Sequence, residues 1–269
     1  MKLIKRTFLI FFGFLLLASC SEYEQVLKGD DYDKKYDMAV KMYKKKKFLK
    51  AIPLLEDVIS IYSKLSEKGE KAYYYLCYSH YNIQEYALAG YYFNSFQITY
   101  PLSEHSEEAA FMSAYCKVND SPKSSLDQSF TLGAINGLQA FLNRYPNTTK
   151  KDTCNTIIRD LRGKLEVKAY ESAKLYYKME EYNAASVAFT NMLKEYPDTK
   201  LREEVLFLIV KSNYKLASNS VSAKKTERFE ETIKSYTKFV DNFPQSNKLK
   251  ELESIYTKSQ KELNLFKSN

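Results

Sequence analysis

Apolar and aromatic residues recur at helical spacing along most of this chain, and prolines interrupt them at regular intervals. Residues three and four positions apart share one face of a helix, so the pattern predicts amphipathic helices. An aromatic residue followed by proline recurs after 45, 51 and 47 residues, at Tyr100-Pro101, Tyr145-Pro146, Tyr196-Pro197 and Phe243-Pro244. Each such pair should end a helix. The hydroxyl residues two positions later should cap the next helix: Ser103, Thr148, Thr199 and Ser246.

Counting back from proline as position 32 brings the packing residues into register with the 34-residue tetratricopeptide repeat. In two repeats, small residues fall at positions 8 and 20 and an aromatic residue at position 24. They are Cys77, Ala89 and Phe93 in one repeat, and Ala173, Ala185 and Phe189 in the other. Small residues at these positions let two antiparallel helices approach closely, and the aromatic ring fills the gap to the neighbouring hairpin.

The same register extends over most of the chain. A first repeat runs from about Asp31 to Lys64 and lacks a closing proline, and the third and fifth repeats carry insertions around Asn119–Gln128 and Ser218–Glu227. We therefore predict an all-α fold over residues 31–269. It should be an α-solenoid of about five tetratricopeptide-like helical hairpins with a C-terminal capping helix near Lys248–Leu265.

Residues 1–19 have the three parts of a secretory signal. Basic residues precede an apolar run from Phe8 to Leu17, which is shorter than the roughly 20 residues that span a bilayer. The sequence Leu17-Ala18-Ser19-Cys20 satisfies the lipobox of bacterial lipoproteins, so we predict cleavage before Cys20 and acylation of that cysteine. Residues 20–30 would then form a lipidated linker, and two or three acyl chains would tether it stably to a bilayer. An ordinary signal peptide cut near Ala18 is the alternative.

The charge balance narrows the choice of partners. The formal net charge of +8 falls to about +5 when Lys2, Lys5 and Arg6 leave with the signal segment. That charge is too mild for a nucleic-acid-binding protein. The basic run Lys44–Lys47 should lie at the turn of the first hairpin, where it is either a solvated turn or a contact with an anionic lipid surface.

The residues that usually carry chemistry are sparse. Of the two histidines, His80 takes a packing position and His105 should lie in solvent, and neither has a partner with metal-ligand spacing. No nucleophile elbow and no glycine-rich phosphate loop occurs. Beyond Cys20 the cysteines are Cys77, Cys116 and Cys154, and we expect Cys77 and Cys116 to be core thiols. We therefore predict a protein that is not an enzyme and has no metal site or cofactor.

The first helix of each tetratricopeptide hairpin lines the concave face, with positions 5, 9, 12 and 13 pointing into it. Position 5 is aromatic in four repeats: Tyr36, Tyr74, Tyr170 and Phe207. Position 12 is tyrosine in the same repeats: Tyr43, Tyr81, Tyr177 and Tyr214. Positions 9 and 13 include Lys44, Lys174, Lys178, Lys211 and Lys215. We predict a groove for a peptide with aromatic side chains and a free carboxylate, although tyrosine at position 12 often serves packing alone.

Four segments in order, together with the lipobox cysteine and the repeats, resemble the BamD family of lipoproteins in the β-barrel assembly machinery. They are Leu126-Asp127-Gln128-Ser129-Phe130-Thr131, Tyr145-Pro146-Asn147-Thr148, Leu161-Arg162-Gly163-Lys164-Leu165 and Tyr182-Asn183-Ala184-Ala185. The resemblance covers nearly all of residues 20–265, and only Cys20 transfers as a defined functional residue.

This resemblance implies a non-enzymatic subunit, lipid-anchored in the outer membrane and facing the periplasm, that helps to fold and insert outer membrane β-barrel proteins. It implies that the C-terminal repeats dock on a BamA-like barrel-core subunit and that the N-terminal repeats receive the terminal strand of unfolded outer membrane proteins. Ser21, directly after the lipidated cysteine, is compatible with outer-membrane sorting.

Two other classes of envelope lipoprotein remain possible. One is a tetratricopeptide-repeat lipoprotein that coordinates cell-wall synthesis with envelope constriction. The other is a nutrient-binding lipoprotein of the SusD type. SusD-type proteins are generally far longer and bind glycans largely through tryptophan, which this chain lacks.

Overall fold

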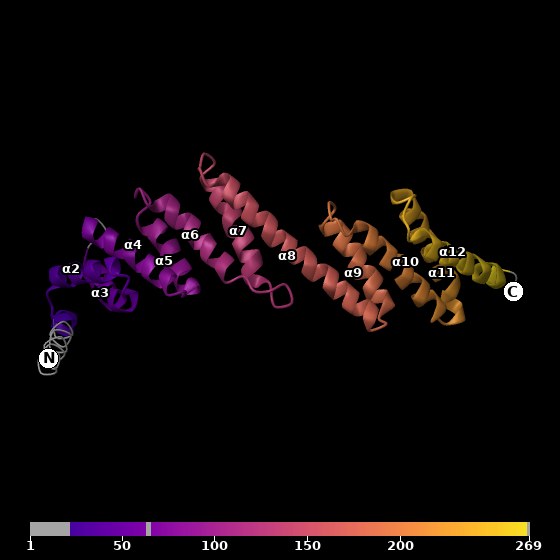
Figure 1. Ribbon diagram of the computed structural model, residues 1–269, viewed down its shortest axis with the longest axis horizontal. Helices are drawn as coiled ribbons and strands as arrows, with labels where there is room; N and C mark the ends of the chain where they lie inside the picture. The colour runs from indigo at the N-terminus through magenta and orange to yellow at the C-terminus, as the bar shows by residue number, and fades with distance from the viewer. Residues whose placement is uncertain (1–21, 63–65, 268–269) are drawn as a thin grey trace, which may run out of the picture. The chain divides into compact units, whose positions relative to one another are not determined.

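The computed structural model describes residues 22–62 and 66–267, with side chains to residue 265, and every regular element in these ranges is a helix. Cys20 and the signal segment lie outside the described residues. Residues 22–28 are helical. The helices that follow (Figure 1) are α2 (Tyr32–Lys44), α3 (Phe48–Ile61), α4 (Glu67–Asn82), α5 (Tyr86–Thr99), α6 (Ser106–Asn119), α7 (Ser129–Arg144), α8 (Lys151–Lys178), α9 (Tyr182–Glu195), α10 (Arg202–Ser218), α11 (Ser222–Asn242) and α12 (Leu249–Lys267).

The helices form the predicted hairpins. Helix α2 pairs with α3, α4 with α5, α6 with α7 and α10 with α11, while α12 packs on α10 and α11 as the capping helix. The chain divides into two compact units within α8: residues up to 122 with 127–159, and residues 123–126 with 160–269. The second half of α8 packs on α9 in the second unit, where Ala173 and Phe189 share one buried cluster.

The core confirms the repeat register. The small residues at positions 8 and 20 are fully buried, namely Ala39, Ala51, Cys77, Ala89, Ala173 and Ala185. Phe93 and Phe189 at position 24 are also fully buried. Side chains without a branch at these points allow the two helices of a hairpin to approach, and the buried rings remove apolar area from water at about 25 cal/mol per Å².

The helix-ending turns repeat one aromatic geometry. Tyr100 lies 5.0 Å from Phe96, Tyr145 lies 5.3 Å from Phe141 and Phe243 lies 5.8 Å from Phe239, measured between ring centroids, with ring planes tilted by 38° to 45°. Each pair is four residues apart, so the second ring folds back over the last turn of its helix. Proline follows at once, and the helix stops there as predicted.

The hydroxyl residues after these turns are not the N-caps that we predicted. The cap positions belong to His105 for α6 and Leu201 for α10, two residues further on. Each hydroxyl instead accepts a backbone N–H from the residue two positions later, at 3.0 Å from His105 to Ser103 and 3.0 Å from Leu201 to Thr199. This is a turn that Ser and Thr form readily, and it leaves the hydroxyl proton available.

That proton is donated to a glutamate at the start of the same hairpin. The bonds are Ser103 to Glu70 (2.6 Å), Thr148 to Glu107 (2.6 Å), Thr199 to Glu166 (2.5 Å) and Ser246 to Glu203 (2.6 Å). We call this pairing the hydroxyl–carboxylate latch. It ties the end of each of these hairpins to its beginning. The first hairpin closes differently, because the Tyr62 hydroxyl donates to Asp33 at 2.5 Å.

The two insertions are accommodated differently. Residues 120–128 form a non-helical connection between α6 and α7, as predicted. The second insertion was predicted around Ser218–Glu227, but only residues 219–221 lie outside helices, and the rest extends α11 to 21 residues. The reason is composition, since Ala, Lys, Glu and Arg in that stretch favour helix. In the described part of the chain, no helix is both long enough and apolar enough to cross a bilayer.

Candidate functional site

In the first unit, the predicted groove residues are half-buried, and each packs on a core cluster. The Lys68 ammonium lies 5.5 Å from the ring of Tyr36. Tyr43 stacks on Tyr75 with ring centroids 4.3 Å apart, and burial raises its pKa to about 12. Tyr81 accepts a hydrogen bond from the Asn119 amide at 3.4 Å. These rings therefore have a structural role, with one edge left accessible.

Glu108 is the centre of this surface. The hydroxyl of Tyr74 donates to one carboxylate oxygen at 2.8 Å, and that of Tyr78 donates to the other at 2.7 Å. Burial acts to raise the pKa of Glu108, but these two hydrogen bonds, with the positive charge of Lys150 and of His105 when protonated, hold it below its usual value. The His105 ring stacks on Tyr74 with centroids 4.2 Å apart, and its side chain is 38% exposed, so this histidine is only partly in solvent.

Sequence reasoning missed Glu108, Tyr78 and the position of His105. All three come from elements that converge only in the fold, since Glu108 is 34 residues from Tyr74 in the chain. Tyr78 occupies position 9 of its repeat, so the register does place it on the concave face, whereas Glu108 and His105 lie outside positions 5, 9, 12 and 13. The only signal available was the negative charge in the first turn of α6, which is also the expected pattern for any helix start.

In the second unit, the tyrosines at the corresponding repeat positions lie beside lysines and not beside a carboxylate. The Lys174 ammonium lies 5.2 Å from the centroid of Tyr170, and Tyr177 contacts Tyr182 at 5.7 Å. Lys178, at the end of α8, is exposed. In the described residues, Lys174 and Lys178 have no carboxylate within 4 Å. A lysine held over an aromatic face but without a carboxylate keeps its charge available to a ligand.

Further along this surface, two lysines flank one ring. Lys211 and Lys248 lie 5.0 and 4.9 Å from the centroid of Phe207. Both are paired, Lys211 with Glu251 at 2.8 Å and Lys248 with Glu204. Burial acts to lower the pKa of Lys211, but the Glu251 hydrogen bond and the nearby carboxylates raise it. We call the set Tyr170, Lys174, Tyr177 and Lys178 the aromatic–lysine face.

The remaining chemistry-bearing residues are part of the core. Cys77, Cys116 and Cys154 are buried free thiols, which confirms the prediction for the first two. Burial raises the pKa of Cys116 to about 12. His80 is also buried, with its Nδ1 2.7 Å from Glu85 and its ring stacked on Tyr92. Within residues 22–62 and 66–265, no cluster of three or more His, Cys, Asp or Glu could hold a metal ion.

A comparison with models of protein families shows which family this chain belongs to. Residues 29–229 match the model of the family YfiO, described as an outer membrane lipoprotein. The chain belongs to this BamD-like family of outer membrane lipoproteins. Membership assigns this chain to the outer membrane, and its family and fold are those of a scaffold lipoprotein and not of an enzyme class.

No curated protein matches the sequence of this chain. Among solved structures, the chain is similar to the yeast histone chaperone Hif1, described as a scaffold protein recruiting protein complexes to core histones. The similarity covers 89% of this chain and 96% of that chain, with 14% identity and a TM-score of 0.28. A TM-score this low carries no argument about fold or function.

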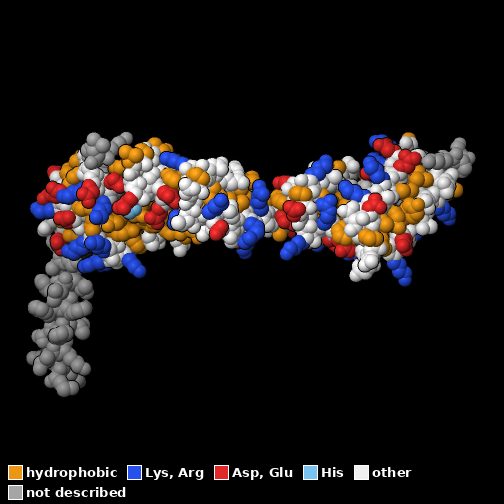
Figure 2. All heavy atoms as spheres, turned by 90° about the horizontal axis from the view of Figure 1, so that it is seen from above, with side chains coloured by type: hydrophobic (Ala, Val, Ile, Leu, Met, Phe, Trp, Pro, Cys, Tyr) orange, Lys and Arg blue, Asp and Glu red, His pale blue; other side chains and the backbone are white. Residues whose placement is uncertain are grey.

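Figure 2 shows basic and acidic side chains interspersed on the face in view, with apolar side chains between them. The basic run Lys44–Lys47 lies at the turn between α2 and α3, as predicted, and all four residues are exposed. Interspersed charge of both signs disfavours non-specific association through a large field of one sign.

Proposed function

We propose that this lipoprotein is a non-enzymatic subunit of the β-barrel assembly machinery, which binds unfolded outer membrane proteins and a BamA-like barrel-core subunit. The observation that carries the proposal is the family match over residues 29–229, on a fold of stacked hairpins. Acylated Cys20 would hold the chain on the periplasmic face of the outer membrane.

The surface chemistry supports a division of labour between the two units that differs from the one implied by the family resemblance, in which the N-terminal repeats receive the terminal strand of the client. An unfolded β-barrel protein ends in alternating aromatic side chains and a free carboxylate, as the family resemblance implies. The aromatic–lysine face offers Lys174 and Lys178 for the carboxylate and the edges of Tyr170 and Tyr177 for aromatic side chains.

The surface of the first unit suits a different part of the client. The Glu108 carboxylate occupies the centre of that surface and already accepts both tyrosine hydroxyls, so a second carboxylate there would be repelled. Tyr36, Tyr43, Tyr74 and Tyr81 therefore suit contacts with internal aromatic residues of the client strand and not with its terminus.

Site-specific photocrosslinking during barrel biogenesis tests the proposal. A photoreactive residue at Tyr170 or Tyr177 should crosslink to the last residues of a nascent barrel protein, and one at Tyr74 or Tyr81 to preceding residues. The control position is Tyr91 on α5, which is 64% exposed and belongs to the second helix of its hairpin. Equal crosslinking from Tyr91, or recovery of peptidoglycan synthases alone, would reject the proposal and favour a cell-wall scaffold.

A peptide measurement separates the carboxylate from the aromatic contribution. A nine-residue client-like peptide ending in Tyr-Ser-Phe should bind the mature chain about tenfold more tightly as the free acid than as the amide, since one charge-assisted bond contributes roughly 1.5 to 3 kcal/mol. The double variant Lys174→Glu and Lys178→Glu should remove this preference. The same two changes at the exposed Lys200 and Lys238 should leave it intact.

A further inference from the structure

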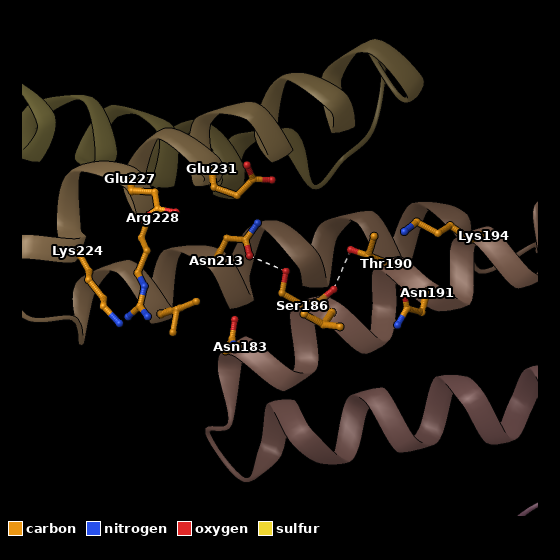
Figure 3. A pocket seen from close by; sticks show the side chains of 12 residues that line it. Asn183, Ser186, Thr190, Asn191, Lys194, Asn213, Lys224, Glu227, Arg228 and Glu231 are labelled. Carbon is orange, nitrogen blue, oxygen red and sulfur yellow. Dashed lines mark hydrogen bonds between the residues drawn. The ribbon is translucent and has the colours of Figure 1, made fainter.

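The second unit contains a groove that the role proposed above does not use. It has a volume of about 650 Å³ and lies between α9 and α11, with Asn213 and Leu216 of α10 among its lining residues (Figure 3). Its walls come from the second helices of two hairpins, whereas the aromatic–lysine face lies on α8. The groove is therefore a separate surface.

Amide and hydroxyl side chains make up five of the twelve residues that line the groove, and charged side chains make up another five. The buried Asn213 accepts a hydrogen bond from the Ser186 hydroxyl at 2.6 Å and donates one to Ser235 at 3.2 Å. An asparagine amide can form four such bonds, so half of its capacity is used here. Asn183 and Asn191 are exposed on the same wall, eight residues and so about 12 Å apart. Amides spaced in this way can pair with the N–H and C=O groups of an extended backbone.

The charges follow an order along the groove. Lys224 and Arg228 lie at one end together with Glu227, Glu231 lies near the middle and Lys194 at the other end (Figure 3). Arg228 donates to Ser220, and Glu231 has an exposed partner, Lys234, at 3.5 Å. An exposed pair of that kind contributes little. The order from end to end is positive, negative, positive.

The groove stays open because its two walls, α9 and α11, are not joined across it by a side-chain bond between described lining residues. In the first unit, a smaller space of about 200 Å³ between α5 and α7 is closed by a hydrogen bond of 2.9 Å from Arg144 to Gln97. In the second unit, α9 and α11 each pack on α10. No hydrogen bond or ion pair in the described part of the chain joins a lining residue of α9 to one of α11.

These features of the groove indicate which class of ligand it can bind. No aromatic side chain lines the groove, so it lacks the stacking plane that sugar rings use, and Val187 and Leu216 are too few to bury an amphipathic helix. From Asn183 to Lys194 the wall is about 16 Å long, which matches five residues of extended chain at about 3.3 Å each. We propose that this groove binds an extended polypeptide segment of about five residues with acidic, basic and acidic side chains in that order.

Fluorescence anisotropy of the mature lipoprotein in detergent tests the proposal. The probe is a fluorescein-labelled peptide with the core Asp-Ser-Lys-Ser-Asp, amidated so that it presents no terminal carboxylate to the aromatic–lysine face. It should bind about tenfold more tightly than the charge-reversed peptide Lys-Ser-Asp-Ser-Lys. Methylating its backbone nitrogens should also weaken binding about tenfold, because the amide donors are lost.

A matched pair of variants locates the site. Lys224→Glu, in the groove, should weaken binding of the acidic–basic–acidic probe about tenfold, whereas Lys238→Glu, exposed on the same helix outside the groove, should not change it. Equal affinity for the two peptides, an unchanged affinity after N-methylation, or displacement of the probe by chitotetraose would each overturn the proposal. These outcomes do not depend on the crosslinking result above, since the probe has neither the terminal carboxylate nor the aromatic side chains that the aromatic–lysine face is proposed to bind.

Discussion

At the scale of single residues, Glu108 links two helices of the first unit. Its carboxylate accepts from Tyr74 on α4 and Tyr78 on α4 while it sits in the first turn of α6. Its pKa is held below the usual 4.5 in the folded chain. A carboxyl whose folded pKa is lowered stabilises the fold above its unfolded pKa, and this contribution is lost as the pH falls through the folded pKa.

We therefore expect a pH-dependent effect from removing one hydroxyl. Tyr78→Phe should lower the free energy of unfolding by about 1 to 2 kcal/mol at pH 7, because a hydrogen bond to a charged group is lost. The loss should shrink at a lower pH, once the pH has fallen through the lowered pKa of Glu108 and the carboxyl is protonated. Urea unfolding at both pH values measures this, with Tyr91→Phe as the exposed control. An equal loss at both pH values would mean that Tyr78 acts through packing and not through the carboxylate.

At the scale of elements, the hydroxyl–carboxylate latch fixes where each hairpin ends. Thr199 is largely buried, and its hydroxyl is the donor to Glu166. Thr199→Val keeps the shape of the side chain and removes the donor, so it should cost about 1 to 3 kcal/mol. Thr257→Val is the control, since Thr257 is exposed and bonds only within α12. Chemical denaturation monitored by circular dichroism would compare them, and equal stability of the two variants would contradict the latch.

Replacing each of two helical glycines by alanine should change the stability of the fold in opposite directions. A Cβ at Gly163 in α8 would meet no atom within 4 Å, whereas a Cβ at Gly137 in α7 would lie 3.0 Å from the Ala114 Cβ. Gly163→Ala should therefore raise stability by about 0.5 to 1 kcal/mol, because alanine loses less backbone entropy in a helix. Gly137→Ala should lower it, because α6 and α7 must move apart. Thermal unfolding of the two variants decides this, and a gain for both would mean that the close contact is easily relieved.

Much of the packing between the helices of one hairpin was predictable from the sequence. The buried Ala39, Ala89 and Phe93 follow from a packing rule that operates within one hairpin, where the partners are close in the chain. The latch was not predictable, because Thr199 and Glu166 are 33 residues apart and either one alone is unremarkable as a turn or helix-start residue. The helical extension before Arg228 was not predicted for another reason, because the repeat register shows where extra residues lie and not whether they lengthen a loop or a helix, which depends on their helix propensity.

At the scale of the whole molecule, the aromatic–lysine face was predictable in outline, because Tyr170 and Lys174 share repeat positions on one helix face. Its charge contrast with the first unit was not, because Glu108 reaches the tyrosines only through the packing of α4 on α6. Side-chain pairs that bridge two hairpins depend on tertiary geometry, which the repeat register alone does not contain.

Membrane attachment is tested at this scale too. Growth with radiolabelled palmitate should label the wild-type chain and the Cys154→Ala variant, in which a buried thiol is removed. Cys20→Ala should take up no label, because the acylated sulfur is gone. Lack of label in the wild-type chain would indicate an ordinary signal peptide cut near Ala18.

The latch also explains how the hairpins tolerate different lengths. Its partners are 33 residues apart in the second and fourth repeats but 41 and 43 apart in the third and fifth. The added residues fall between the two partners, in the connection after α6 and at the start of α11. Evolution can therefore add or trim segments inside a hairpin while the starting point of the following hairpin is preserved, so new outer surface can arise without rebuilding the stack.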